Sequence, residues 1–486
     1  MGAMWLLAAL LLLAAASPAP RPRARDLGVP FDGTPGAWNA ITDVAGVTVG
    51  HETIVSGEGK LVVGKGPVRT GVTAVFPRGR DTDRPAPAAW FSLNGNGEMT
   101  GTAWIEESGL LHGPVLLTNT HGVGVVRDAA LAWRIKHGPP DAEGYYWSSL
   151  PVVGETWDGE LNDINGFHVK PENVARAIET AKPGPVAEGN VGGGTGSICF
   201  EFKGGMGTSS RKLPAKRGGF TVGVLVQCNC GRRPQLTIAG VPVGREIPEQ
   251  PAYGEDADET GSILIVIATD APLLPHQLER VARRASMGLA RLGSISGNGS
   301  GDLFVAFSTS DPSWDAAKRR YTTSYLSNED LDPVFEATVQ ATEEAIVNAL
   351  VAAETMTGID GKTVIALPHD RLKKALAKYG RCESSSIARC GRAGRARSSA
   401  TASARGPMRP PRTSSRGSPR SSSGRGWPKA TGSRSTCRPP RSTCSCGSRP
   451  SRRGSSRARS TRMRHRRRSK RRSSSSPREA SSTGPG

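Results

Sequence analysis

A strand–helix–strand succession in the middle of the chain constrains the fold more than any other feature of the sequence. Two apolar runs of strand length, at 262–269 and 302–309, are rich in β-branched and aromatic residues. Between them, residues 275–292 place leucine, valine and alanine on one helical face, with arginine and glutamate opposite. The pattern therefore predicts two buried strands joined by an amphipathic helix.

This connection has a geometric consequence for the starts of the two strands. If both strands share a sheet, the helical crossover makes them parallel and brings their first residues to one edge. A glycine-rich loop at 293–301 precedes the second strand. We therefore expect Ser262 to lie near Ser300 and Asp302.

The rest of the body reads as one large unit of mixed helices and strands, from residue 27 to about 380. Further strand-like runs occupy 47–55, 71–76, 114–120 and 220–227. Helical patterns occupy 171–182 and 328–356, and no internal repeat indicates a solenoid.

The basic character of the chain is confined to its end. The formal charge is +21, but residues 381–486 hold 29 lysines and arginines against two acids, Glu383 and Glu479. The rest of the chain has 35 basic and 41 acidic residues, a net charge of −6. The end segment has one isoleucine and no leucine, valine, phenylalanine or tyrosine, so the composition predicts a disordered Arg/Ser-rich tail at 381–486.

Two interpretations of this tail remain open. A polybasic arm would bind nucleic acid or an anionic membrane by releasing counterions. Alternatively, the tail is a non-native extension that replaced the natural end, which the abrupt change of composition after Gly380 favours.

The N-terminus resembles an export signal. Its apolar run from Trp5 to Ala16 is too short to span a bilayer but suits the central region of a signal peptide. Three alanines, 14–16, offer a small-residue cleavage site. We therefore expect a signal peptide and linker in residues 1–26, no stable membrane span, and a secreted or periplasmic protein, or a cytoplasmic one if the run is not a signal.

Metal and cofactor chemistry have little support in the sequence. Three of the eight cysteines lie in the body, at Cys199, Cys228 and Cys230. An odd count at this spacing gives no disulfide framework, and one C-x-C is a weak metal signal, so we expect ordinary small apolar residues. The body histidines considered as ligands are scattered and are expected to be structural; they are His51, His112, His121 and His168. We expect no metal and no cofactor.

Common motifs for other chemistries are absent from the body sequence. No G-x-S-x-G nucleophile elbow occurs, and the glycine-rich stretch at 189–207 lacks the Lys-Ser/Thr of a P-loop. No H-E-x-x-H zinc motif occurs either.

The Gly261–Ser262 pair allows another kind of active serine. A turn glycine before a polar strand residue is the ordinary interpretation. The sharper one is that the bond between them is cut, leaving Ser262 with a hydroxyl and an α-amine that acts as its base. Such an amine titrates near ~7.7–8.0, which suits a proton acceptor at neutral pH. Glycine before the serine permits the close backbone approach that self-attack needs.

Five segments in the same order carry a resemblance to a known family. They cover 94–101, 150–169, 188–211, 260–278 and 296–309. Over residues 27–380 the chain resembles the L-aminopeptidase/D-esterase family, self-processing serine peptidases that include the β-peptidyl aminopeptidases. The resemblance implies an α+β fold, an αββα sandwich like that of N-terminal-nucleophile hydrolases. It also implies self-cleavage into an α chain, 27–261, and a β chain, 262–380.

The resemblance assigns roles to five residues. Ser262 matches the nucleophile, and Ser300 and Asp302 match the supporting serine and acid. Asn229 matches an oxyanion-hole asparagine. A neutral amide at that position would stabilise the tetrahedral intermediate by donating to its oxyanion. Glu155 matches an acid that holds the free amine of the substrate.

One position departs from the family pattern. Where the family places an oxyanion tyrosine, this sequence has Trp157, whose indole N–H is still a donor. Tyr145 or Tyr146 is the alternative donor.

A second Gly-Ser pair competes for the cleavage site. The stretch TGSICF at 195–200 nearly repeats TGSILI at 260–265, so Ser197 is a rival to Ser262. Only the second stretch is followed by the helix and the Ser-x-Asp loop, which favours Ser262.

The resemblance implies an aminopeptidase that releases N-terminal residues from short peptides, amides or esters through an acyl-Ser262 intermediate. The resemblance also implies a homo-oligomer of αβ units, and no nucleic acid is required. Two rivals remain: an acyltransferase of the ornithine acetyltransferase type, which uses a threonine nucleophile, and a nucleic-acid-binding protein acting through its tail.

Overall fold

The structure is a computed structural model, and it describes most of the body of the chain. The described residues are 21–82, 84–137, 150–254, 257, 261–315, 318 and 320–381. The chain divides into two units, residues 1–398 and 399–486, and the second lies wholly outside the described residues. The predictions of a leader before residue 21 and of a disordered tail therefore fall on residues that the structure does not describe.

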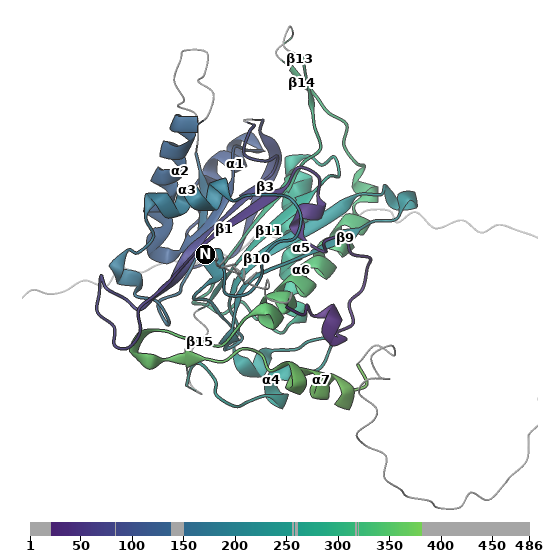
Figure 1. The fold of residues 1–486 in the computed structure, drawn as a ribbon. Coiled ribbons are helices and arrows are strands. Elements are labelled where there is room, and N and C mark those ends of the chain that lie inside the picture. Colours follow the sequence, from purple (N-terminus) through teal and green to yellow (C-terminus); the bar gives the residue numbers. More distant parts are fainter. Residues whose placement is uncertain are drawn as a thin grey trace, which may run out of the picture. The chain divides into compact units, whose positions relative to one another are not determined.

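Two β-sheets form the centre of the described unit (Figure 1). The larger sheet has the strand order β4-β3-β12-β11-β10-β9, and the smaller has the order β1-β2-β5-β6. The larger sheet consists of β3 (Ala86–Gly95), β4 (Leu110–Leu111), β9 (Gly205–Lys212), β10 (Thr221–Asn229), β11 (Ser262–Thr269) and β12 (Gly301–Ser308). The smaller consists of β1 (Thr48–Ser56), β2 (Val68–Phe76), β5 (Val115–Asn119) and β6 (Val152–Thr156).

The predicted strand–helix–strand unit is confirmed. β11 pairs with β12 in parallel, and Ile263 lies opposite Asp302. On its other side β11 pairs with β10 in the antiparallel sense, which puts Ser262 opposite Asn229. The crossover helix is α5 (Pro275–Arg291), one residue shorter than predicted.

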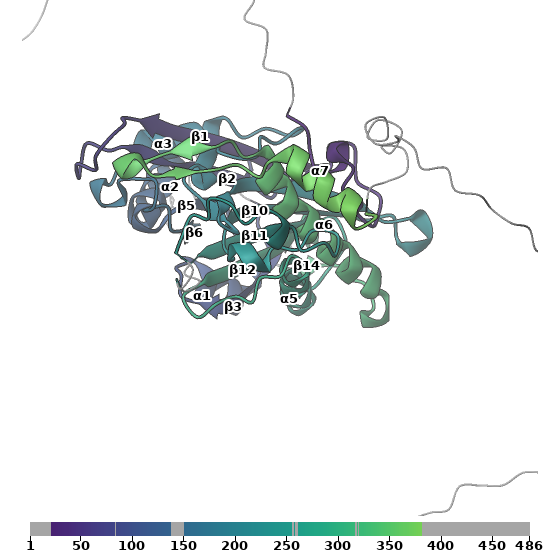
Figure 2. The ribbon, with the colours of Figure 1, turned by 90° about the horizontal axis from the view of Figure 1, so that it is seen from below.

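Helices cover the outer face of each sheet, which makes four layers (Figure 2). α5 and α6 (Asp332–Ala352) pack on the larger sheet, against β3, β12, β9 and β10. α2 (Val123–His137) and α3 (Pro171–Glu179) pack on the smaller sheet. The order helix–sheet–sheet–helix confirms the αββα sandwich that the resemblance implies.

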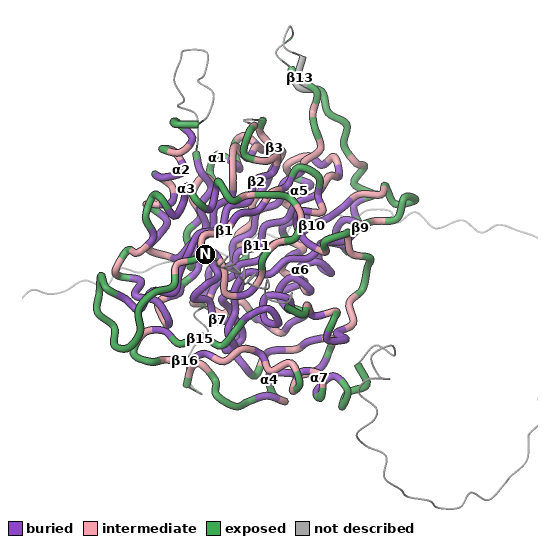
Figure 3. The backbone as a smooth tube through the Cα atoms, in the orientation of Figure 1, coloured by how far each residue is buried: buried purple, intermediate pink, exposed green. Residues whose placement is uncertain are grey.

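The side chains of β11 show why its sequence is a continuous apolar run. Ile263, Ile265 and Ile267 face the core beneath α5 and α6, while Leu264 and Val266 face the core between the sheets. Because both faces of the strand are buried, polar residues have no place in its interior. Figure 3 shows the central strands as buried; every residue of β10, β11 and β12 is buried, whereas β1 and β3 are buried only in part.

Shorter elements connect and cap these layers. They are α1 (Thr102–Ser108), α4 (Val243–Glu246), α7 (His369–Lys378), β7 (Ile198–Cys199), β8 (Phe202–Lys203), β13 (Ser313–Asp315), β14 (Arg320–Thr322), β15 (Met356–Thr357) and β16 (Thr363–Val364). Among the described residues, no helix combines the length and apolar character that crossing a bilayer requires.

Residues 21–26, predicted to belong to a linker, pack on the body instead. Ala24 is fully buried, and the Arg25 guanidinium pairs with the buried Glu344 carboxylate of α6 at 2.8 Å. Arg23 pairs with Glu188 at the same distance. Acidic partners far along the chain therefore anchor these two arginines to the body.

Candidate active site

Ser262 is the first residue of β11, at the edge where two neighbouring strands also end or begin. Its hydroxyl accepts a hydrogen bond from the backbone N–H of Gly301 at 3.1 Å, and the residue is 5% exposed. The predicted proximity of the two strand starts is therefore present in the structure.

Gly261 occupies a position that no larger residue fits. A Cβ atom built there would lie 2.1 Å from the Asn229 carbonyl oxygen and 2.9 Å from the Cys230 Cα. Both contacts are with backbone atoms, which cannot swing away as a side chain can. The close approach between the end of β10 and the residue before β11 therefore requires glycine.

Ser300 and Asp302 are fully buried and hydrogen-bonded to each other, with the serine hydroxyl donating to the carboxylate. The loop before β12 is held from the neighbouring strand β3 and the residues after it. Asn94 donates to the Gly297 carbonyl at 2.7 Å, and Asn96 donates to the Gly299 carbonyl at the same distance. Residues 94–97, which belong to the first segment of the family resemblance, thus position the loop, a role that the sequence did not predict.

Asn229 ends β10, directly across from Ser262. Its side-chain oxygen Oδ1 accepts a hydrogen bond from the Ile198 backbone N–H at 2.6 Å. With the oxygen engaged in this way, the amide presents its NH₂ group as a donor on the other side. This is the polarity that an oxyanion-stabilising amide needs.

Glu155 reaches the same site from the smaller sheet, near the end of β6. It is 4% exposed, and its carboxylate accepts hydrogen bonds from the Glu98 backbone N–H at 2.9 Å and from the Thr120 hydroxyl. Burial raises the pKa of Glu155 above its ordinary value, although both hydrogen bonds favour the charged form. A buried carboxylate of this kind gains most from a cationic partner.

A cavity of about 240 Å³ joins these groups across the two sheets. It is lined by Asn96, Thr120, Glu155, Trp157, Ser262 and Gly299. Thr120 and Asn96 were not predicted, and no motif in the sequence assigns them to a site. The carboxylate from one sheet and the serine from the other therefore line the same cavity.

Trp157 lines this cavity and belongs to a cluster of three aromatic rings. Its side of the cavity is partly open, since the residue is 39% exposed. His121 meets Trp157 edge-on with ring centroids 6.0 Å apart, and it stacks on Phe167 at 5.7 Å. Tyr145 and Tyr146 lie outside the described residues.

The other histidines considered as ligands have structural contacts. His51 bonds the Thr73 hydroxyl at 2.9 Å, and burial lowers its pKa to about 4. His168 pairs with Asp163 at 2.8 Å. Burial also lowers the pKa of the half-buried His112. Of the four, His121 is the one whose ring contacts Trp157, a residue that lines the cavity.

Ser197, the rival serine, lies in a different environment. It is fully buried, and its carbonyl oxygen accepts from the Lys203 ammonium at 2.7 Å. Its hydroxyl has no hydrogen-bond partner among the described residues. Burial lowers the pKa of Lys203 to about 7 and raises that of the nearby Asp158 to about 7. Ser197 is not among the residues that line the cavity at Ser262.

The expectation for the cysteines is wrong for two of them. Cys199 and Cys228 form a disulfide, with Cα atoms 5.7 Å apart. The β7–β8 hairpin folds back onto the end of β10, a proximity that spacing along the chain does not reveal. Cys230 lies outside the disulfide, and its sulfur is 3.9 Å from that of Cys228. The three sulfurs lie within 4.8 Å of one another, which is a possible metal-ligand grouping when the cysteines are reduced.

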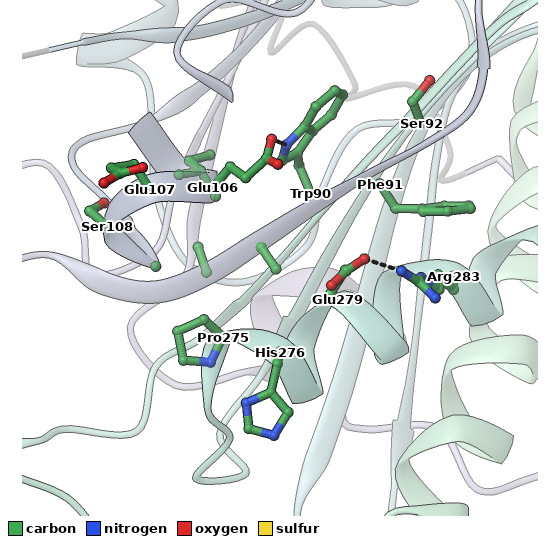
Figure 4. A pocket seen from close by; sticks show the side chains of 14 residues that line it. Trp90, Phe91, Ser92, Glu106, Glu107, Ser108, Pro275, His276, Glu279 and Arg283 are labelled. Atoms are coloured by element: carbon green, nitrogen blue, oxygen red, sulfur yellow. Dashed lines mark hydrogen bonds and ion pairs between the residues drawn. The ribbon is translucent and has the colours of Figure 1, made fainter. Parts of the chain in front are cut away.

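A larger cavity of about 660 Å³ lies between β3, α1 and the start of α5 (Figure 4). Two pairs of its polar side chains are engaged with each other: Trp90 donates to Glu106 at 3.4 Å, and Arg283 pairs with Glu279. Its described lining includes none of the predicted site residues. The cavity at Ser262 is therefore the candidate active site, although it is the smaller of the two.

The chain is similar in sequence to two β-peptidyl aminopeptidases. The β-peptidyl aminopeptidase BapA of Sphingosinicella microcystinivorans is 56% identical over 384 residues, covering 76% of this chain and 96% of that protein. BapA of Sphingosinicella xenopeptidilytica is 50% identical over 388 residues, covering 77% of this chain and 96% of that protein.

Two solved structures are similar to this chain as well. An L-aminopeptidase D-Ala-esterase/amidase from Ochrobactrum anthropi, described as a variant of the Ntn hydrolase fold, has 46% identity and a TM-score of 0.68. It covers 75% of this chain and is itself covered completely. A β-aminopeptidase from Burkholderia sp. has 48% identity and a TM-score of 0.67, covering 74% of this chain and 99% of that chain. The match to peptidase family S58 spans residues 39–364, so this chain belongs to that family and has the Ntn hydrolase fold.

Proposed function

We propose that this chain is a self-processed aminopeptidase whose nucleophile is Ser262 at the start of the released β chain. The single observation that carries the proposal is the shared cavity. Ser262 and Glu155 line this one cavity, and Asn229 lies directly across from the serine in the neighbouring strand. A nucleophile beside a buried acid suits a substrate whose reacting carbonyl is close to a free amine.

Self-cleavage begins with the serine and the peptide bond before it. The Ser262 oxygen attacks the Gly261 carbonyl carbon, and the bond from that carbon to the Ser262 nitrogen breaks. The hydroxyl proton passes to the nitrogen, which leaves an ester between the two residues. Water then hydrolyses the ester, giving a Gly261 carboxylate and a Ser262 with free amine and hydroxyl.

The new α-amine then acts as the base for turnover. It takes the proton of the Ser262 hydroxyl as the oxygen attacks the substrate carbonyl, and it returns a proton to the leaving amine or alcohol. The acyl group stays on Ser262 until water releases it. Ser300 and Asp302 hold the neighbouring strand start, where Gly301 donates to the Ser262 oxygen.

Charge is stabilised at two places during this reaction. The Asn229 amide is oriented to donate to the oxyanion, and the Trp157 indole N–H is the candidate second donor in the cavity lining. Glu155 binds the substrate ammonium, which limits the enzyme to residues with a free N-terminus. A cavity of about 240 Å³ suits one residue rather than an extended peptide.

The relatives narrow the substrate class. Two of them are β-peptidyl aminopeptidases, and a structural neighbour is an esterase and amidase. We therefore include β-amino acyl peptides, amides and esters among the substrates. The Cys199–Cys228 disulfide supports an exported protein, because disulfides persist in oxidising compartments. Assembly of αβ units into a homo-oligomer remains part of the proposal.

A pair of matched substrates tests the function. The purified protein is given a short β-amino acyl peptide with a free amine and the same peptide with an acetylated amine, and product is followed by chromatography. We expect hydrolysis of the free peptide and a loss of at least ~100-fold for the acetylated one, because truncating a buried charge pair is costly. Equal hydrolysis of both would exclude an aminopeptidase.

A further inference from the structure

The oxyanion amide is held by a contact between two separate segments of the chain. The Ile198 backbone N–H, in β7, donates to Oδ1 of Asn229 at the end of β10, at 2.6 Å. Cys199 follows Ile198 in sequence, and Cys228 precedes Asn229. The disulfide therefore joins the same two segments one residue away from the hydrogen bond.

We propose that the Cys199–Cys228 disulfide is a positioning element for the Asn229 carboxamide. The inference rests on the proposed function, because it assumes that Asn229 donates to the oxyanion. The cysteines touch no substrate, and they act through the residues beside them.

The segment that holds the amide is also tied to the residues after β10 by side-chain contacts, since Arg233 donates hydrogen bonds to the carbonyls of Phe200 and Glu201. β7 pairs only with β8, in a separate two-stranded sheet, and it is not a strand of the larger sheet. One backbone hydrogen bond, from Phe200 N–H to the Cys230 carbonyl at 2.6 Å, connects this hairpin with the residue after β10. The covalent bond adds a tie at Cys228, on the other side of Asn229.

The chemistry of an asparagine side chain makes such a tie useful. The terminal torsion of asparagine is broad and roughly two-fold, so packing alone does not decide which way the amide faces. Turning it by half a circle would point an oxygen, not an NH₂ group, at the developing negative charge. The Ile198 N–H prevents this as long as it stays within hydrogen-bonding distance of Oδ1. Catalytic groups need a supporting shell that holds them to about 0.5 Å.

Cys230 provides a matched control on the same strand end. It is buried like the other two cysteines and lies beside the same asparagine, but it takes no part in the disulfide. A Cys230→Ser variant therefore tests the loss of a neighbouring thiol without loss of the crosslink.

The experiment is a double-mutant cycle between the crosslink and the amide. The double variant Cys199→Ser/Cys228→Ser is made in the wild-type and Asn229→Ala backgrounds, and kcat and KM are measured for a free-amine dipeptide. In the wild-type background we expect kcat to fall about 10- to 100-fold with KM changed less than about twofold. In the Asn229→Ala background we expect the same change to lower kcat less than about threefold, because coupled residues are not additive. Cys230→Ser retains wild-type kcat.

Equal losses in both backgrounds, or no loss in the wild-type background, would overturn the positioning role. If Asn229→Ala itself leaves kcat unchanged, the oxyanion assignment fails, which is a different result. If the double variant does not fold, wild-type and Asn229→Ala proteins are compared before and after phosphine reduction, with thiols counted by mass after alkylation. Loss of kcat in step with the crosslink in wild type alone supports the inference, and full kcat after reduction contradicts it.

Discussion

The molecule contains two Gly-Ser junctions of nearly the same sequence, Gly196–Ser197 and Gly261–Ser262, and both need their glycine. A Cβ atom would lie 2.4 Å from a backbone carbonyl oxygen at the first junction and 2.1 Å at the second. Both serines are buried, at 0% and 5% exposure. The glycine requirement and the burial of the serine therefore do not distinguish them.

The surroundings of the two serines distinguish them. Ser262 begins a central strand, lines a cavity with Glu155, and receives a backbone hydrogen bond from the Ser300–Asp302 loop. The carbonyl oxygen of Ser197 accepts a hydrogen bond from the buried Lys203 ammonium, and the Ser197 hydroxyl has no partner among the described residues. A reactive serine is thus defined by what other strands bring to it, not by its own dipeptide.

The largest contrast is expected between the two serine-to-alanine variants. Ser262→Ala should remain a single chain and lose at least ~10⁴-fold in kcat/KM, as removal of a nucleophile does. Ser197→Ala removes a hydroxyl without a described partner and should cleave itself and turn over normally. Gel electrophoresis and peptide hydrolysis measure both, and a processed Ser262→Ala protein would break the comparison.

The two glycines provide the next contrast. Gly261→Ala should slow self-cleavage about 100-fold, because relieving the contact with the Asn229 carbonyl shifts the reacting carbonyl by about 1 Å. Gly196→Ala has a similar clash, with the Arg69 carbonyl oxygen, and should cost about 1–3 kcal/mol of stability, as overpacking does. Its processing rate should stay within about twofold of wild type. Thermal unfolding and the time course of cleavage separate these effects, and equal processing rates would contradict them.

Removal of the loop support should have a smaller effect. Ser300→Ala leaves Asp302 without this hydroxyl donor and should lower both processing and kcat by about 10- to 100-fold. Ser286→Ala removes a buried α5 hydroxyl that has no described partner and is the matched control. If both variants behave alike in single-turnover assays, the loop has no special role.

The smallest expected effect concerns substrate binding and its pH dependence. Burial raises the pKa of Glu155, so its carboxylate takes up a proton at a higher pH than an exposed glutamate does. As pH falls through this raised pKa, the charge that binds the substrate ammonium disappears and KM rises. Glu155→Gln should raise KM about 10-fold near neutral pH and remove the acid-side rise in KM. A steep rise that persists in the variant would assign it to another group.

The sequence predicts the part of the fold that lies around β11 and β12, because those strands are buried on both faces and read as apolar runs. It does not predict β9, whose residues include glycine, serine and threonine. The helix α6 packs closely on this strand, and a Cβ atom at Gly207 would lie 2.1 Å from the Ala345 carbonyl oxygen. Small residues here reflect close packing and not a loop.

The site residues also fall into those that local sequence rules predict and those that they do not. The loop and nucleophile lie within one strand–helix–strand unit, so local rules bring Ser262 and Asp302 together. The resemblance alone supplied Glu155 and Asn229, because they come from other strands and, for Glu155, from another sheet. The disulfide was missed for the same reason, since it depends on where a short hairpin folds.

The central claim is that the chain cuts itself between Gly261 and Ser262, and the mass of the purified native protein tests it most directly. Intact mass spectrometry with N-terminal sequencing of each species should give two chains, one of which begins Ser-Ile-Leu-Ile. An active preparation that consists of the uncut chain, or of a second chain that begins at any other residue, would contradict the account.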